Sequence, residues 1–240
     1  MRILLINPNT TAAVTDLVAI HARTVAPADV EIKAVTGRFG ARYISSRAAA
    51  AVAGHAALDA LAEHAAGHDA VCLACFGDPG LLALKEMSPV PVVGMAEASC
   101  QAASAMGKRF AIVTGGVLWG PMLTEFVGLI GLADRLNGVY AVAPTGGEIA
   151  RDPNRALDML ADACRDAARE GADAVVLGGA ALAGLAERIE ARVPVPVICS
   201  TRAAVEATIR AAGSARVPAA RQAQPVESVG LSGALTRALG

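Results

Sequence analysis

The feature that most constrains this chain is a segment that occurs twice. Residues 69–93 read DAVCLACFGDPGLLALKEMSPVPVV, and residues 173–198 read DAVVLGGAALAGLAERIEARVPVPVI. Each copy is typical of a buried strand, a turn, a short helix and a second strand, and the second copy has one extra residue. Aligned from Asp69 and Asp173, the copies place Cys75 opposite Gly179. The repeat therefore predicts two similar halves, with a thiol at this position in the first and no side chain in the second.

Strand and helix patterns alternate along both halves, which predicts parallel sheets covered by helices on both faces. Outside the repeat, strands are predicted at 2–6, 31–35, 109–114 and 139–142, and residues 145–147 are expected to form a loop. Helices are predicted at 11–25, 47–65, 96–106, 121–130, 153–170 and 202–212. The predicted fold class is α/β, with two similar lobes related by a pseudo-twofold axis and a site between them.

The alternation also predicts how the chain divides. We assign residues 1–95 with about 199–213 to a first α/β lobe, and residues 96–198 to a second. Residues 214–240 are rich in Ala, Pro, Gln and Ser and are expected to form a loose tail or a subunit-contact arm.

Composition narrows the possible partners and compartment. The net charge is −1, which gives no basis for a nucleic-acid or membrane partner. No apolar run approaches the ~18 residues of a transmembrane helix, and no signal-peptide pattern is present, so we predict a cytoplasmic protein. The five cysteines and four histidines show no metal-binding spacing, so neither a metal nor a cofactor is expected. We also expect a homo-oligomer.

Polar and glycine-containing loops follow several predicted strands. Ligands of open α/β sheets bind beyond the carboxyl ends of the strands, where the loops at Asn7, Cys75, Thr114 and Gly179 are expected to meet. Such a site suits a small molecule with carboxylate or imide oxygens. The predicted substrate-binding residues are Asn7, Asn9, Thr10, Tyr43, Ser45, Phe76, Gly77, Thr114, Gly115, Gly178, Gly179 and Ala180.

Cys75 is the predicted catalytic residue. A thiolate at a strand end, facing backbone N–H groups, has a lowered pKa and can remove a proton from carbon. The turn after Cys75 offers the N–H groups of Phe76 and Gly77, and Asp78 is expected to cap the helix that follows it. The alternative is that Cys75 is a buried apolar residue, the commonest role of a free cysteine.

Three motifs resemble the hydantoin racemase branch of the aspartate/glutamate racemase superfamily. They are INPNT at 6–10, CFGDPGL at 75–81 and PVVGMAEA at 91–98. The resemblance covers about residues 1–213 and implies cofactor-independent proton transfer by two cysteines on opposite faces of a substrate carbon. Cys75 matches the first cysteine. The second belongs to an LGCAG-like turn, but here residues 177–184 read LGGAALAG, with Gly179 at its position.

The missing thiol leaves three functions open. The first is a racemase or isomerase acting beside a carbonyl or carboxylate, with Cys199 as the candidate second acid or base. Cys199 aligns with Gly94, one strand from the Gly179 turn, although a buried cysteine ending a strand is the more common explanation. The second is a single-cysteine decarboxylase like arylmalonate decarboxylase. The third is a non-catalytic ligand-binding relative. We take the first as the prediction.

Overall fold

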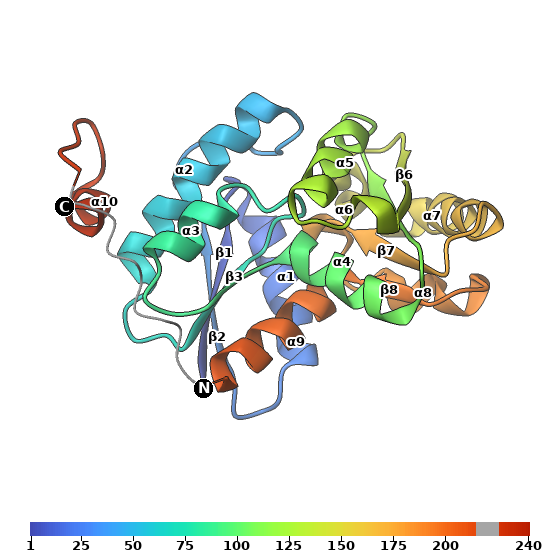
Figure 1. The fold of residues 1–240 in the computed structure, drawn as a ribbon, viewed down its shortest axis with the longest axis horizontal. Coiled ribbons are helices and arrows are strands. Elements are labelled where there is room, and N and C mark those ends of the chain that lie inside the picture. Colours follow the sequence, from blue (N-terminus) through green and yellow to red (C-terminus); the bar gives the residue numbers. More distant parts are fainter. Residues whose placement is uncertain (215–225) are drawn as a thin grey trace.

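Each half of the chain builds a four-stranded parallel sheet, and the two sheets have the same strand order. The computed structural model describes residues 1–214 and 226–240. Its first sheet, in the order β2-β1-β3-β4, contains β1 (Arg2–Asn7), β2 (Glu31–Thr36), β3 (Ala70–Leu73) and β4 (Val92–Gly94). The second, in the order β6-β5-β7-β8, contains β5 (Phe110–Gly115), β6 (Leu136–Val142), β7 (Ala174–Gly178) and β8 (Val197–Cys199). The predicted two-lobed α/β fold is confirmed, and Figure 1 shows the lobes side by side.

Helices cover both sheets. They are α1 (Ala12–Val25), α2 (Arg47–His64), α3 (Leu81–Met87), α4 (Met95–Met106), α5 (Trp119–Leu129), α6 (Gly146–Arg151), α7 (Pro153–Arg169), α8 (Ala186–Ile189), α9 (Ser200–Gly213) and α10 (Gly233–Leu239). Short 3-10 turns occur at Ala133–Arg135, Ala180–Leu182 and Glu190–Arg192. No helix in the described part of the chain is both long and apolar enough to cross a membrane.

The aspartates of the two DAV segments explain why this sequence is repeated. The carboxylate of Asp69 accepts a hydrogen bond from the backbone N–H of Arg2 at 2.6 Å, and its own N–H donates to the Arg2 carbonyl at 2.7 Å. Asp173 makes the same pair of bonds with Arg109, at 2.9 and 2.8 Å. Each aspartate therefore joins the start of a central strand to its neighbour, and the two lobes acquire the same register.

Alternating side chains divide the apolar core into three parts. On β1 and β5 one set of residues, such as Ile3 and Phe110, packs in a cluster shared by both lobes and filled by α1, α4, α5 and α9. The residues between them point to the outer faces, where Leu4 packs beneath α2 and α3, and Val113 packs beneath α7 and α8. Because successive side chains of a strand point to opposite faces, both faces of each sheet are covered by apolar packing.

Two helices cross between the lobes. Helix α4 follows the first repeat but packs on β7, and α9 follows the second repeat but packs on β3 and β4. On this basis we propose the division expected from the sequence, with α9 grouped with residues 1–95.

Two segments are more ordered than the sequence analysis predicted. The expected loop at 145–147 is wrong, because Thr145 and Glu148 form a reciprocal capping box that starts α6. The expected loose tail is also wrong in part, since α10 packs on α2 and buries Leu235. Residues 215–225 of that predicted tail lie outside the described residues.

Candidate functional site

A small cavity lies where the carboxyl ends of β1, β3 and β5 meet the turn after β7. Its volume is about 50 Å³, and its lining comes from both lobes. The lining residues are Asn9, Val14, Tyr43, Ile44, Cys75, Phe76, Thr114, Trp119, Gly179, Ala180 and Ala181. Seven of these are predicted site residues, namely Asn9, Tyr43, Cys75, Phe76, Thr114, Gly179 and Ala180. The topology thus brings Cys75 and Gly179, 104 positions apart in the sequence, to one cavity.

Cys75 lies two residues beyond the end of β3 and is buried. Burial raises the pKa of its thiol, and the nearby Asp78 carboxyl raises it further. The lowered pKa expected from the sequence is therefore wrong for this structure, because the cost of burying a thiolate exceeds any gain from the surrounding N–H groups. Cys75 rests as a neutral thiol, which is ready to donate a proton.

Asp78 caps a different helix from the one expected. Its own turn leads into α3, whose N-cap is Gly80. The Asp78 carboxylate instead accepts hydrogen bonds from Ala96 N at 3.0 Å and Glu97 N at 2.8 Å, in the first turn of α4. A side chain at Gly94 would overlap this carboxylate, so the glycine provides the space for the cap. Asp78 thereby ties the Cys75 turn to the neighbouring helix.

The turn opposite Cys75 has a backbone that suits glycine. Gly179 has φ +145°, a conformation that L side chains rarely adopt. In the described chain, Asp78 is the one non-glycine residue with a positive φ. The N–H of Gly179 donates to Ser200 Oγ at 3.3 Å. The preceding Gly178 lies against the Phe76 ring, which a Cβ at that position would overlap. The two turns therefore differ in backbone conformation as well as in the thiol.

Hydrogen-bond donors surround the cavity on both sides. Among the described residues, the backbone N–H groups of Phe76, Ala180 and Ala181 have no acceptor within hydrogen-bond distance. The same holds for the side-chain nitrogen of Asn9, and the Thr114 hydroxyl also lacks a described partner. Such donors suit carbonyl oxygens and an oxyanion formed from one of them.

Other predicted residues support the cavity without lining it. Asn7 holds Asn9 in place, because its side chain donates to Asn9 Oδ1 at 3.0 Å and accepts from Asn9 N at 3.3 Å. Thr10 binds the loop above the site through its backbone N–H, which donates to Ala41 O at 3.2 Å. The remaining predicted residues outside the lining are Ser45, Gly77, Gly115 and Gly178.

Tyr43 joins the two lobes over the cavity. Its hydroxyl donates to Gly115 O at 3.0 Å and accepts from Trp119 Nε1 and Gly146 N, each at 3.2 Å. Burial raises the pKa of Tyr43, so its hydroxyl stays protonated and serves as a structural link.

The apolar part of the lining was not predicted from the sequence. Val14, Ile44, Trp119 and Ala181 complete the wall. Trp119 is the single tryptophan of an aromatic-poor chain, and that rarity was the one signal that pointed to it. The other three belong to ordinary aliphatic patterns, from which the wall of a cavity cannot be recognised.

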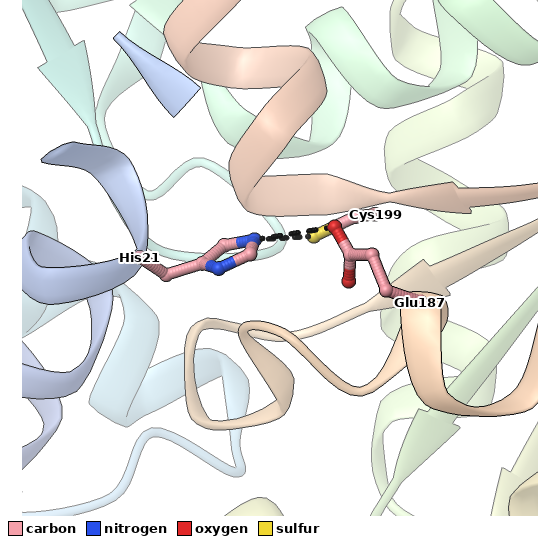
Figure 2. A group of neighbouring side chains, drawn as sticks. All are labelled: His21, Glu187 and Cys199. Carbon is pink, nitrogen blue, oxygen red and sulfur yellow. Dashed lines mark hydrogen bonds and ion pairs between the residues drawn. The ribbon is translucent and has the colours of Figure 1, made fainter. Parts of the chain in front are cut away.

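Cys199, the predicted second acid or base, is absent from the cavity lining. Its sulfur lies 3.4 Å from Nε2 of His21, and that nitrogen lies 3.5 Å from Oε1 of Glu187, as Figure 2 shows. The role of Cys199 in proton transfer stays a prediction.

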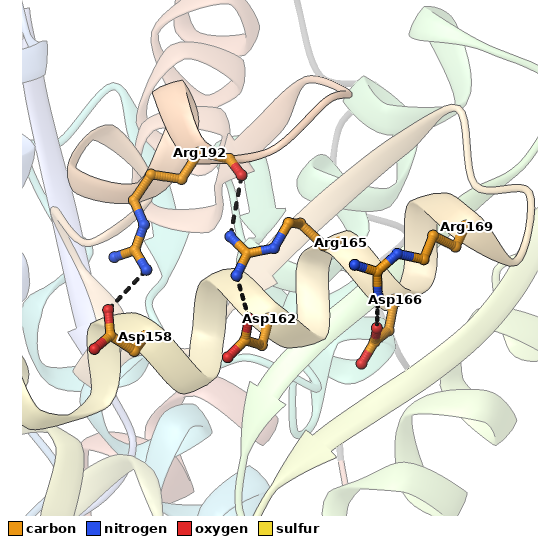
Figure 3. Close-up of polar contacts among 6 residues, drawn as sticks. All are labelled: Asp158, Asp162, Arg165, Asp166, Arg169 and Arg192. Atoms are coloured by element: carbon orange, nitrogen blue, oxygen red, sulfur yellow. Dashed lines mark hydrogen bonds and ion pairs between the residues drawn. The ribbon is translucent and has the colours of Figure 1, made fainter.

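A row of charged side chains on α7 serves the surface rather than the cavity. Asp158 pairs with Arg192 at 2.7 Å, and the pairs Asp162–Arg165 and Asp166–Arg169 follow along the helix (Figure 3). Exposed pairs contribute about 0–1 kcal/mol each, and none of these residues lines the cavity.

The chain is similar to known racemases in both sequence and structure. A family model described as Asp/Glu/hydantoin racemase matches residues 3–208. A hydantoin racemase from Paenarthrobacter aurescens is 36% identical over 209 residues, covering 85% of this chain and 88% of the relative. Another, from Pseudomonas sp. (strain NS671), is 34% identical over 208 residues, covering 86% and 84%. The crystal structure of an allantoin racemase from Pseudomonas fluorescens superposes with a TM-score of 0.90 at 31% identity, covering 96% of this chain and 100% of that one.

Proposed function

We propose, from the premise that this chain belongs to the Asp/Glu/hydantoin racemase family, that it racemises 5-substituted hydantoins through Cys75 without a cofactor. The family resemblance seen in the sequence is confirmed by the match over residues 3–208 and by the hydantoin racemases to which the chain is similar.

The observation that carries this choice of substrate is the lack of a cationic side chain in the lining. Among the described residues, the cavity wall contains no Lys, Arg or His. A substrate with free carboxylates, such as an acidic amino acid, would be buried there without a counter-ion, which is costly. A neutral hydantoin ring needs only hydrogen-bond donors, which Asn9, Thr114 and the backbone N–H groups offer. Apolar neighbours such as Val14 and Ile44 suit an apolar 5-substituent.

The reaction is proton transfer at the ring carbon next to a carbonyl. When the proton leaves, the electron pair of the C–H bond delocalises onto the carbonyl oxygen, where N–H donors stabilise the oxyanion. The Cys75 thiol then gives its proton to the carbon on its own face, and the electron pair returns from oxygen to carbon. In the reverse direction the Cys75 thiolate removes that proton.

Racemisation also needs a proton carrier on the face of Gly179, which has no side chain. Cys199 is the predicted carrier, but its sulfur contacts His21. The Ser200 hydroxyl, which accepts the hydrogen bond from the Gly179 N–H, lies on this side and can orient a water molecule as the alternative carrier.

The size of the cavity adds a requirement for substrate entry. A volume of about 50 Å³ holds a few water molecules. We therefore propose that the loop carrying Tyr43 and Ile44 moves outward to admit a five-membered ring.

A one-thiol decarboxylase is the second candidate function. It is favoured by one observation, that Cys75 is a protonated thiol facing a turn without a side chain. The same lack of cationic groups argues against it, because a malonate carries two carboxylates.

The test uses deuterated water. Each enantiomer of a 5-benzylhydantoin, and separately phenylmalonate, is incubated with the wild type, Cys75→Ser, Cys199→Ala and the buried control Cys164→Ser. We expect both hydantoin enantiomers to interconvert with incorporation of deuterium, and Cys75→Ser to lose this activity while Cys164→Ser keeps it.

The other outcomes identify what is wrong. Interconversion that survives in Cys199→Ala removes Cys199 as the second carrier. Release of carbon dioxide from phenylmalonate without hydantoin exchange moves the assignment to a decarboxylase. Full activity in Cys75→Ser refutes the mechanism, and binding without turnover indicates a non-catalytic relative.

The cytoplasmic location and the homo-oligomeric state also stay predictions, the latter to be measured by sedimentation.

A further inference from the structure

A cluster of three polar side chains lies outside the cavity, at the boundary between the lobes. His21 comes from α1, Glu187 from α8, and Cys199 from the end of β8. Their ligand atoms all lie within 4.8 Å of one another. No metal site is predicted from the sequence, because 166 and 12 positions separate these residues along the chain and no motif connects them.

The arrangement of the three atoms distinguishes between two kinds of site. In a catalytic triad, the imidazole contacts the nucleophile with one ring nitrogen and the carboxylate with the other. Here the sulfur of Cys199 and the oxygen of Glu187 both lie beside Nε2 of His21, at 3.4 and 3.5 Å (Figure 2). Three ligand atoms that converge on one point are typical of a shared cation rather than of a relay.

Two of the three distances between the ligand atoms match tetrahedral coordination, and the third, from sulfur to oxygen, lies within 4.8 Å. Zinc binds sulfur at about 2.3 Å and imidazole nitrogen or carboxylate oxygen at about 2.0–2.2 Å. At tetrahedral angles these bonds separate sulfur from nitrogen by about 3.6 Å, and nitrogen from oxygen by about 3.4 Å. The observed separations of 3.4 and 3.5 Å differ from these values by at most about 0.2 Å. We propose that His21, Glu187 and Cys199 bind one Zn²⁺ ion, with the fourth position open to water.

Chemistry and access agree with this assignment. Thiolate, imidazole and carboxylate together select zinc over Mg²⁺ or Ca²⁺, which prefer oxygen ligands. The side chains of His21 and Glu187 are 15% and 37% exposed, so an ion can reach them from solvent.

One neighbouring cation competes for the site. The Arg202 guanidinium lies 3.3 Å from Glu187 Oε1, but it also lies 3.9 Å from Glu206 and can pair with that residue instead. We expect Arg202→Gln to bind Zn²⁺ more tightly than the wild type, since it removes a positive charge beside the ion.

Zinc bound here would tie α1 of the first lobe to β8 and α8 of the second. The inference does not depend on the proposed racemase activity, because its readout is metal binding. It does conflict with Cys199 as the second proton carrier, since a zinc-bound thiolate is not free to exchange protons.

The experiment titrates chelator-treated protein with ZnCl₂ by calorimetry and measures bound zinc after dialysis. We expect one Zn²⁺ per wild-type chain, and affinity reduced more than about 100-fold in Cys199→Ser and in His21→Ala. Cys164→Ser and Cys75→Ser, which remove cysteines elsewhere, should bind like the wild type. Excess Mg²⁺ or Ca²⁺ should not displace the zinc.

Two further measurements, cobalt absorption and a zinc-dependent Tm shift, test the site if one variant folds poorly. Co²⁺ should give a thiolate-to-metal charge-transfer absorption with the wild type that is absent in Cys199→Ser. Zinc at about 100 times its Kd should raise the Tm by about 5–10 °C, and His21→Ala should lose this shift. Absence of zinc binding in the wild type, or undiminished binding in both Cys199→Ser and His21→Ala, would overturn the inference.

Discussion

Asp78 offers the sharpest test of how the candidate site is held together. Its buried carboxylate accepts hydrogen bonds from Ala96 N and Glu97 N, at 3.0 and 2.8 Å. Asp78→Ala leaves both donors without an acceptor, and each buried unsatisfied donor costs about 1–3 kcal/mol. Alanine is also strained at the φ of +45° found here, which aspartate and asparagine tolerate better. We expect a loss of about 3–5 kcal/mol in the free energy of unfolding, and about half of that for Asp78→Asn, which keeps one acceptor oxygen.

The chain contains a matched control for this substitution. Asp173 also accepts two backbone hydrogen bonds, from Lys108 N at 2.7 Å and Arg109 N at 2.9 Å, but it is exposed. Water can replace its carboxylate, so Asp173→Ala should cost clearly less than Asp78→Ala. Equilibrium urea unfolding followed by circular dichroism measures both. Equal losses in the two variants would refute the reasoning that burial makes the Asp78 cap costly to remove.

The two aspartates should also respond oppositely to pH. Burial raises the pKa of Asp78 from the ordinary 3.8 to about 7, and this outweighs the two N–H bonds, which act in the other direction. A raised pKa means that the folded state holds the proton more tightly than the unfolded state. The contribution of Asp78 is then fully present below pH ~4 and is lost as the pH rises to ~7. One pKa unit is worth about 1.36 kcal/mol, so the loss is at most about 4 kcal/mol.

The difference between wild type and Asp78→Asn isolates this effect, because the other groups titrate alike in both. We expect the stability advantage of the wild type over Asp78→Asn to shrink between pH 4 and pH 7. The stability advantage of the wild type over Asp173→Asn should instead grow with pH, since hydrogen bonds from the backbone N–H groups of Arg109 and Lys108 lower the pKa of Asp173. A constant difference for Asp78→Asn across this range would show that Asp78 is ionised in the folded protein.

Three further predictions concern the cavity. Because burial raises the pKa of Cys75, the rate of alkylation by iodoacetamide should rise about tenfold per pH unit between pH 7 and 9, and a plateau in that range would contradict a protonated resting thiol. Gly178→Ala should overlap the Phe76 ring, costing about 1–3 kcal/mol and raising KM for the hydantoin; unchanged urea unfolding would exclude this contact. Gly179→Cys places a side chain at φ +145°, so a cost of order 1–3 kcal/mol is expected without a faster racemisation, and a stable variant with a higher rate would show that the turn adopts another conformation.

The repeated segment by itself determined the architecture of this protein. The DAV aspartates and the alternating strands and helices are local patterns, and each copy builds the same unit wherever it occurs. The alignment of the copies also paired Cys75 with Gly179, because equivalent positions of a repeat come to equivalent sheet edges. Both residues line one cavity. Seven of the thirteen residues predicted to form the site, counting Cys75, lie in the wall of this cavity. They were predicted because they follow the carboxyl ends of strands, or belong to loops near them.

The tertiary structure decided what those residues can do. Asp78 caps α4 rather than α3, because the pairing of β3 with β4 brings the N-terminus of α4 beside its turn. The pKa of Cys75 is raised, because desolvation depends on how completely both lobes enclose the thiol. Cys199 meets His21 and Glu187, because α1 of the first lobe packs against α9 and the Ala180–Leu182 turn of the second half. Periodicity and spacing describe neighbours along the chain, whereas burial and charge depend on segments that meet only after folding.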